Sequence, residues 1–125
     1  MKRSVLVVLM LMTAGMSYGQ TWYTANSHTF GWDVVDTATS YRTFLKPWKG
    51  GEMLTTVEVT TPQATVTLTV EGRFYPCVQA VRVPEGETEP LLSDVVCSDV
   101  AVNCQNGNIF GFRYFVPPGN PHNLR

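Results

Sequence analysis

The sequence predicts an all-β sandwich of about seven short strands in two sheets. From Ala64 to Val70, apolar residues alternate with threonine, so Val66, Leu68 and Val70 share one face of a strand. Glycine, proline, aspartate and serine break the chain at short intervals, as they do between the strands of antiparallel sheets. Beyond residue 20, the apolar spacing of an amphipathic helix is hard to find.

The order of the elements follows from the turn formers between them. Strands are expected at residues 28–35, 40–46, 57–60, 64–70, 74–83 and 94–102. They are separated by 36–39, 47–51, 61–63, 71–72 and 84–90, where Asp bonds its own backbone, Pro fixes φ and Gly permits positive φ. Pro76 removes a ladder donor within 74–83, which predicts a bulge or a locally open edge.

Residues 1–19 have the order of a secretory signal peptide. Lys2 and Arg3 precede an apolar stretch, and Ser17-Tyr18-Gly19 supplies small residues for a cut after Gly19. The apolar stretch is shorter than the roughly 20 residues that span a bilayer. We therefore expect a secreted or periplasmic protein, bacterial by the type of signal, with no membrane span after cleavage.

The mature chain is mildly acidic. Two of the nine basic residues, Lys2 and Arg3, precede the cut, so seven basic residues face ten acidic ones and the net charge is −3. Without a basic cluster, nucleic acid is not an expected partner, because phosphate contacts supply most of that affinity. His28 and His122 lie far from each other and from the cysteines, so no metal site is expected. No catalytic or cofactor motif appears, so we expect neither enzyme activity nor a cofactor.

Five segments share their order and spacing with one known family: Phe30–Asp33, Ala38–Phe44, Val70–Phe74, Val78–Val81 and Pro90–Val96. Over residues 28–102, this set resembles a single fibronectin type III module. The resemblance implies an immunoglobulin-like sandwich with Trp32, Tyr41 and Phe74 in its core. It also implies a role in protein binding, adhesion or spacing.

The chain departs from that family at a corner and at its ends. The family has a corner tyrosine where this chain has Phe74, and Tyr75 would face the opposite side. Only residues 20–27 precede the second strand, whereas a segment similar to the family's first strand, Pro118–Leu124, lies near the C-terminus. The expected division is a signal peptide (1–19), a sandwich (20–104) and an extended tail or linker (105–125).

Two interpretations of the tail stay open. The prolines exclude it from a central strand, so it is a linker or the start of a second module. Alternatively it supplies a first strand, by folding back or by adding to the open edge of another copy, which would give an oligomer. Within 105–125, residues 111–116 have the composition of one more strand.

The three cysteines lie in the exported part of the chain, where disulfides persist. If Val78 and Ala80 face the core, Cys77 faces out and can bridge Cys97 on the neighbouring last strand. A bridge between Cys97 and Cys104 is the main rival. Either pairing leaves one thiol over.

Trp48, Trp22 and Tyr23 are the candidate binding residues. Trp48 lies between lysines in a loop, where it could stack on a sugar, anchor a protein partner, or fold over the sandwich as a lid. We expect an exported, non-catalytic interaction or spacer module with a protein or glycan partner. The alternatives are a carbohydrate-contacting accessory module and a subunit of a surface assembly joined by strand addition.

Overall fold

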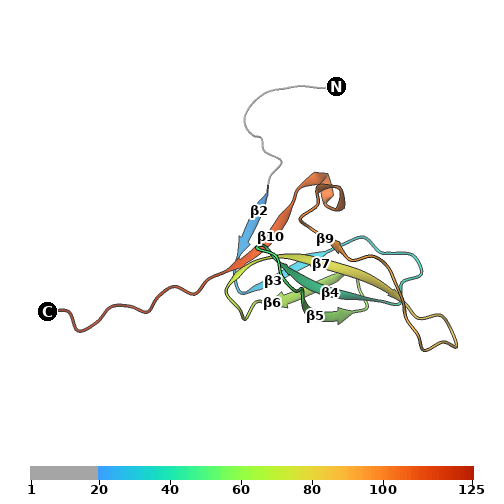
Figure 1. Cartoon of the computed structure of the whole chain (residues 1–125), viewed down its shortest axis with the longest axis horizontal. Helices are drawn as coiled ribbons and strands as arrows, with labels where there is room; N and C mark the ends of the chain where they lie inside the picture. Colours follow the sequence, from blue (N-terminus) through green and yellow to red (C-terminus); the bar gives the residue numbers. More distant parts are fainter. Residues whose placement is uncertain (1–19) are drawn as a thin grey trace, which may run out of the picture.

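The computed structural model describes residues 20–125 (Figure 1), so the expected signal peptide lies outside the described residues. The strands are β2 (Thr21–Thr24), β3 (Ser27–Gly31), β4 (Ser40–Pro47), β5 (Leu54–Val59), β6 (Gln63–Thr67), β7 (Gly72–Arg82), β8 (Leu91–Leu92), β9 (Val96–Cys97) and β10 (Phe110–Tyr114). Two short 3-10 helices, η1 (Ala101–Asn103) and η2 (Gln105–Gly107), precede β10. Among residues 20–125, no helix is long and apolar enough to cross a membrane.

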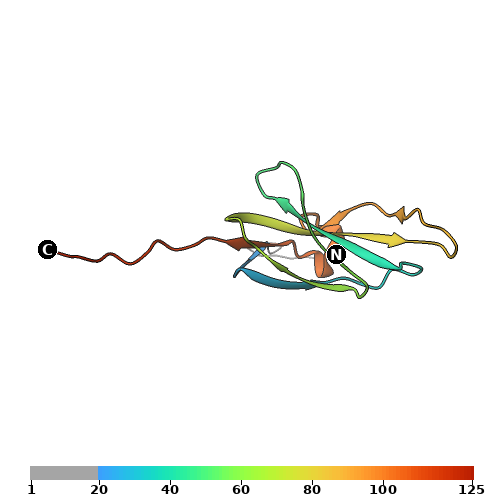
Figure 2. The same ribbon diagram turned by 90° about the horizontal axis from the view of Figure 1, so that it is seen from below.

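The strands form two sheets of unequal size, which confirms the all-β prediction. The larger sheet has the order β2-β10-β7-β4-β5, with β8 and β9 also paired to β7, and the smaller sheet consists of β3 and β6. Figure 2 shows the two layers, with β4 and β7 on one side and β3 and β6 on the other. The core between the layers holds Phe30, Leu45, Ala64, Val66, Leu68, Phe74 and Phe112. Burial of each aromatic ring contributes on the order of 2–3 kcal/mol.

The rings expected in the core lie there to different degrees. Tyr41 and Phe74 are buried, whereas Trp32 is partly buried and packs against the core cluster. The Trp32 ring centroid lies 5.2 Å from that of Tyr41 and 5.4 Å from that of Phe30. The rings of Phe30, Trp32 and Tyr41 therefore close one end of the space between the sheets.

One edge of β7 is paired by three successive pieces of chain. Leu92 of β8 lies opposite Val81, Cys97 of β9 opposite Cys77, and Phe112 of β10 opposite Phe74. The segment 99–109, which contains η1 and η2, leaves this edge between β9 and β10. The expected strand 94–102 is therefore much shorter than predicted, because its regular pairing is confined to Val96–Cys97.

Pro76 gives the physical reason for this interruption. The Ser98 N–H donates to the Pro76 carbonyl oxygen at 3.1 Å, so the backbone of Pro76 faces this edge. Proline has no N–H to return to the ladder, and the chain leaves the sheet directly after Ser98. The locally open edge expected at Pro76 is confirmed.

The sandwich also extends further than the sequence indicated. β10 pairs antiparallel with β7 and parallel with β2, so the sheet continues to Tyr114 and the boundary expected at Cys104 needs correction. The alternation of Phe110 and Phe112 with Gly111 and Arg113 explains this, since it gives β10 one apolar face. The first expected strand is shorter than predicted and ends at Gly31.

The smaller sheet has an open edge along β3. The Trp32 N–H donates to the Pro62 carbonyl at 3.0 Å, and the Leu68 N–H donates to the Asn26 carbonyl at 2.7 Å. Backbone groups alternate in an antiparallel pair, so even-numbered residues of β3 face β6 and the odd-numbered ones face away. Within residues 20–125, no strand pairs with this outward side.

The C-terminal tail, residues 115–125, extends away from the sandwich (Figures 1 and 2). It is exposed along its whole length. Its last hydrogen bond to the sandwich is from the Val116 N–H to the Glu71 carboxylate, at 2.7 Å.

Candidate functional site

An aromatic cluster covers the outer face of the larger sheet at the start of β7. Phe74 points into the core, so Arg73 and Tyr75 point outward. The Trp22 ring of β2 lies 5.2 Å from Tyr75 and 6.3 Å from Trp48, which follows β4. We call Trp22, Trp48, Arg73 and Tyr75 the aromatic cluster.

The Arg73 guanidinium lies over both indole rings of the cluster. Its central carbon is 5.5 Å from the Trp22 ring centroid and 5.0 Å from that of Trp48. The Trp48 N–H donates to the Arg73 carbonyl at 2.9 Å, which holds the loop after β4 against β7. Trp48 nevertheless stays 47% exposed, so the cluster presents an aromatic surface to solvent.

A glycine makes room for Trp22. Gly111 of β10 lies directly opposite Trp22 in the parallel pair, and a Cβ at this position would be 2.4 Å from the Trp22 ring. Real Cβ atoms do not approach a ring that closely. The absence of a side chain at Gly111 therefore leaves the space that the Trp22 ring occupies.

A second arginine lies beside the first. Arg113 of β10 is directly opposite Arg73, and its guanidinium carbon lies 5.1 Å from the Phe115 ring centroid. Among residues 20–125, the ion pairs are Arg42–Glu58 and Lys46–Asp99, so neither arginine is paired with a carboxylate. Like charges placed opposite each other destabilise a sheet. This outer face therefore carries uncompensated positive charge on a mildly acidic chain.

A groove of about 400 Å³ adjoins the cluster. Trp48 and Lys49 line one side, Phe115 lies in its wall, and Glu71 and Arg73 also border it. Lys49 and Arg73 outnumber the single carboxylate of Glu71 in this lining, so the groove carries a net positive charge. An aromatic surface with a cationic groove suits an anionic ligand that also has an apolar part.

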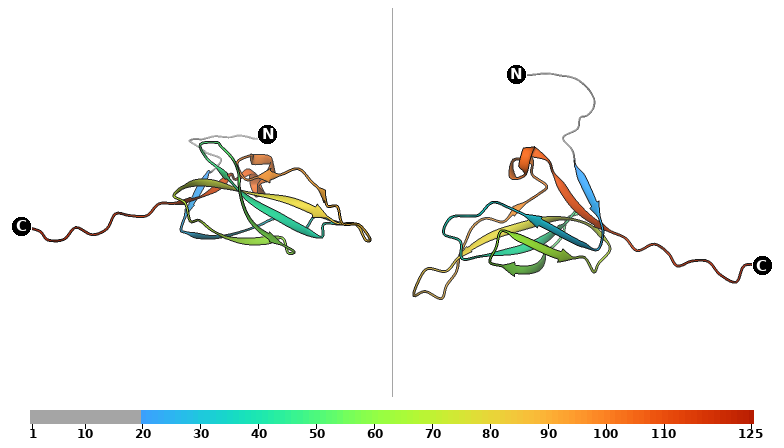
Figure 3. Two further views of the ribbon diagram at one scale, coloured as in Figure 1. Left: turned by 60° about the horizontal axis from the view of Figure 1, so that its bottom comes forward. Right: turned by 180° about the vertical axis from the view of Figure 1, so that it is seen from behind.

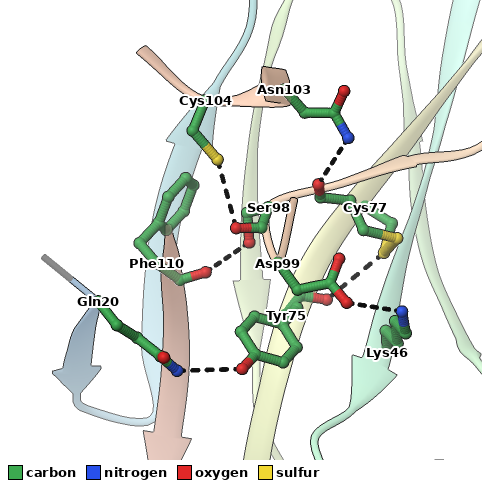
Figure 4. Close-up of polar contacts among 10 residues, drawn as sticks. Gln20, Lys46, Tyr75, Cys77, Ser98, Asp99, Asn103, Cys104 and Phe110 are labelled. Atoms are coloured by element: carbon green, nitrogen blue, oxygen red, sulfur yellow. Dashed lines mark hydrogen bonds and ion pairs between the residues drawn. A yellow bond between two sulfur atoms is a disulfide. The ribbon is translucent and has the colours of Figure 1, made fainter. Parts of the chain in front are cut away.

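The disulfide lies just beyond this cluster (Figure 4). Cys77 and Cys97 are directly opposite on β7 and β9, with a Cα–Cα distance of 4.1 Å, which confirms the expected bridge. Cys77 lies opposite Phe44, on the face turned away from the core, as expected. It is still only 1% exposed.

Polar contacts hold the segment 99–109 in place, as Figure 4 shows. The Lys46 ammonium lies 2.6 Å from the Asp99 carboxylate, and the Asn103 amide donates to the Cys97 carbonyl at 3.1 Å. On the other side, the Gln20 amide donates to the Tyr75 hydroxyl at 3.0 Å. The first two contacts anchor the segment 99–109 to β4 and β9, and the third anchors the start of the described chain to β7.

Cys104 is the thiol left over, so the rival bridge between Cys97 and Cys104 is wrong. Its sulfur lies 3.3 Å from the Ser98 carbonyl oxygen, to which the thiol donates. Burial, reinforced by the negative charge of Asp99, raises the pKa of this thiol above its usual value. The neutral thiol therefore predominates at physiological pH.

The structure separates the three predicted binding residues. Trp22 and Trp48 meet in the aromatic cluster, where Trp48 folds back onto the sandwich. Tyr23 is on the other face of β2, with its ring 6.2 Å from that of Phe110. Sequence reasoning missed Arg73 and Arg113, although each adjoins a core phenylalanine, Phe74 or Phe112, and therefore faces outward on its strand.

Comparison with known proteins gives no relative from which the ligand of this chain could be inferred. Among residues 20–125, no group of three or more His, Cys, Asp or Glu side chains could hold a metal ion. The candidate site is therefore defined by its own geometry, a positively charged aromatic surface. No protein-family model, curated protein or solved structure matches the chain.

Proposed function

We propose that this chain is an exported, non-catalytic interaction module of the fibronectin type III kind. Its outer face binds a protein segment that carries carboxylates next to an aromatic or other apolar side chain. One observation carries the proposal: Arg73 and Arg113 lie side by side, without carboxylate partners, among the rings of Trp22, Trp48 and Phe115.

The arrangement of the core supports the family part of the proposal. Tyr41 lies in Ala38–Phe44, one of the five segments that resemble the family. Its ring packs against Trp32, which the resemblance also assigns to the core. The buried bridge between Cys77 and Cys97 is compatible with an oxidising compartment and hence with export. In this chain β2 pairs parallel with β10, and the smaller sheet has two strands.

The composition of the cluster favours a protein partner over a glycan. A sugar stacks on a free ring face, and Arg73 already lies over one face of both Trp22 and Trp48, which reduces the ring surface left for a sugar. Tryptophan, tyrosine and arginine are the residue types that contribute most of the energy in protein interfaces. Carboxylates of a partner would give the two guanidinium groups their missing counter-charges, with bidentate geometry.

Selection from a random peptide library on the purified protein tests this proposal. Selected peptides should be rich in Asp and Glu next to aromatic residues, and their affinity should fall as salt is raised. Arg73→Gln and Arg113→Gln should each weaken binding at least tenfold, since each removes a charged hydrogen-bond donor.

Arg42→Gln is the matched control, because Arg42 already has Glu58 as a partner on the same sheet. It should leave peptide affinity unchanged. Peptides without acidic residues, or equal losses in all three variants, would contradict the proposal. Retention on a glycan array that Trp48→Ala abolishes would establish the carbohydrate-contacting alternative instead.

A further inference from the structure

We infer that the open edge of β3 receives residues 117–124 of a second copy of this chain as an added strand. The site is separate from the aromatic cluster, on the other side of β2 and β10. It goes beyond the proposed function, because the partner is the protein itself and the contact is made by backbone groups.

A groove of about 670 Å³ runs along this edge. β3 forms one wall, while Tyr23 of β2 and residues 105–110 form the other. His28, Phe30 and Phe112 contribute the apolar floor, where the His28 ring stacks on Phe112 with centroids 4.2 Å apart. The groove lining contains no Asp, Glu, Lys or Arg.

The edge of β3 offers regularly spaced hydrogen-bonding groups. Ser27, Thr29 and Gly31 direct their N–H and C=O groups into the groove, since the even-numbered residues are bonded to β6. An extended segment beside β3 would form a third strand of the smaller sheet. Strand addition of this kind draws its affinity from main-chain hydrogen bonds.

The tail has the chemistry and the proline spacing that this edge requires. Residues 115–124 contain no Asp, Glu, Lys or Arg, which matches the uncharged groove. In an antiparallel register, Asn120, His122 and Leu124 face Gly31, Thr29 and Ser27. Pro121 then occupies a position whose N–H would point away from β3, so its missing donor removes no ladder bond. Pro117 and Pro118 fall beyond Gly31, where β3 ends.

The direction of the tail selects a second copy as the acceptor. Figure 3 shows that the tail leaves β10 in the direction opposite to the direction of β3. The same chain would have to reverse completely, and it would then run parallel to β3. The tail of another copy enters antiparallel without a reversal, and it is free to do so, with Leu124 86% exposed.

Two complementary variants test the inference. Thr29→Pro removes the central donor of the groove and keeps the tail. A chain that ends at Val116 keeps the groove and the bond to Glu71 but lacks the tail. The unaltered protein should form larger species as its concentration rises, and each variant alone should be a monomer in analytical ultracentrifugation. A mixture of the two variants should give a one-to-one heterodimer.

Thr65→Pro is the matched control for the fold. Thr65 lies opposite Thr29 in the same sheet, and the two hydroxyl groups bond each other at 2.7 Å, so both variants lose the same contact. The Thr65 N–H faces the other edge of the sheet, so this variant should assemble like the unaltered protein.

A synthetic peptide of residues 115–125 gives an independent measurement. It should bind the chain that ends at Val116, and His122→Pro in the peptide should weaken binding at least tenfold. Asn123→Pro should have little effect, because that N–H faces away. A strictly monomeric unaltered protein, a mixture that stays monomeric, or equal binding of the two proline peptides would overturn the inference.

Discussion

The two sheets of this molecule are stabilised very differently. The larger sheet is braced on its outer face by the bridge between Cys77 and Cys97, by the aromatic cluster and by the ion pair between Lys46 and Asp99. The smaller sheet has two strands, no bridge and an open edge. The difference shows where folding free energy is concentrated, around β7, and where a place for a further strand is left, beside β3.

The largest expected effect comes from the contact between the sheets. Phe112→Ala removes a ring that is 2% exposed and touches both the smaller and the larger sheet, so it should lower the free energy of unfolding by about 3–5 kcal/mol. Urea denaturation followed by tryptophan fluorescence measures this. Phe115→Ala, at a ring that is 47% exposed, should change stability by less than about 0.5 kcal/mol. Similar losses in both variants would mean that Phe112 is not part of a core.

Removal of the disulfide should come next. Replacing both Cys77 and Cys97 by alanine frees a loop with a sequence separation of 20 residues and should lower stability by about 2–4 kcal/mol. Denaturation with and without a reducing agent measures the same quantity in the unaltered protein. Cys104→Ser should leave the effect of reduction intact, because Cys104 is outside the bridge. If reduction has no effect, the bridge does not brace the larger sheet.

A smaller loss is expected from Gly111→Ala. The added methyl group would meet the Trp22 ring at 2.4 Å and the Phe74 carbonyl oxygen at 2.9 Å, so the indole must move away from the sheet. Overpacking of this kind costs about 1–3 kcal/mol. Near-ultraviolet circular dichroism would report the displaced tryptophan, and Gly119→Ala, with nothing within 4 Å, should leave both stability and spectrum unchanged.

The smallest effect concerns the Cys104 thiol. Its pKa is raised by burial and by Asp99, and only the thiolate reacts, so at a given pH the folded protein has less of the reactive form. Alkylation should be slower than in the urea-unfolded chain, and its rate should rise at a higher pH. Asp99→Asn should shift that rise toward lower pH. An alkylation profile equal to that of the unfolded chain would show that the thiol is not shielded.

Much of the sandwich could be predicted from the sequence because its signals are local. The alternation in β6 and β7 and the turn formers between strands fix the faces of the core. Pro76 even marked the position where the edge of β7 lacks a donor. The pairing of Cys77 with Cys97 followed from the expected strand neighbours.

The remaining features depend on contacts between distant segments. β2 could pair with either sheet, and nothing within Thr21–Thr24 selects the parallel place beside β10. Arg73 and Arg113 are 40 positions apart in the sequence, and only the pairing of β7 with β10 makes them neighbours. Trp22 and Trp48 could be chosen as candidate binding residues from the sequence. That both rings pack against Arg73 could not be predicted from it.

The departure of the chain after Ser98 has a practical meaning for protein engineering. The Ser98 carbonyl accepts the Phe110 N–H at 3.4 Å, so the chain leaves and rejoins the sheet at neighbouring points on the same edge. Because closing a loop grows costlier only slowly with length, by about 0.6 kcal/mol for each doubling, longer sequences are tolerable between these points. Foreign epitopes or recognition loops could be grafted there, anchored at one end by a covalent link and at the other by a strand.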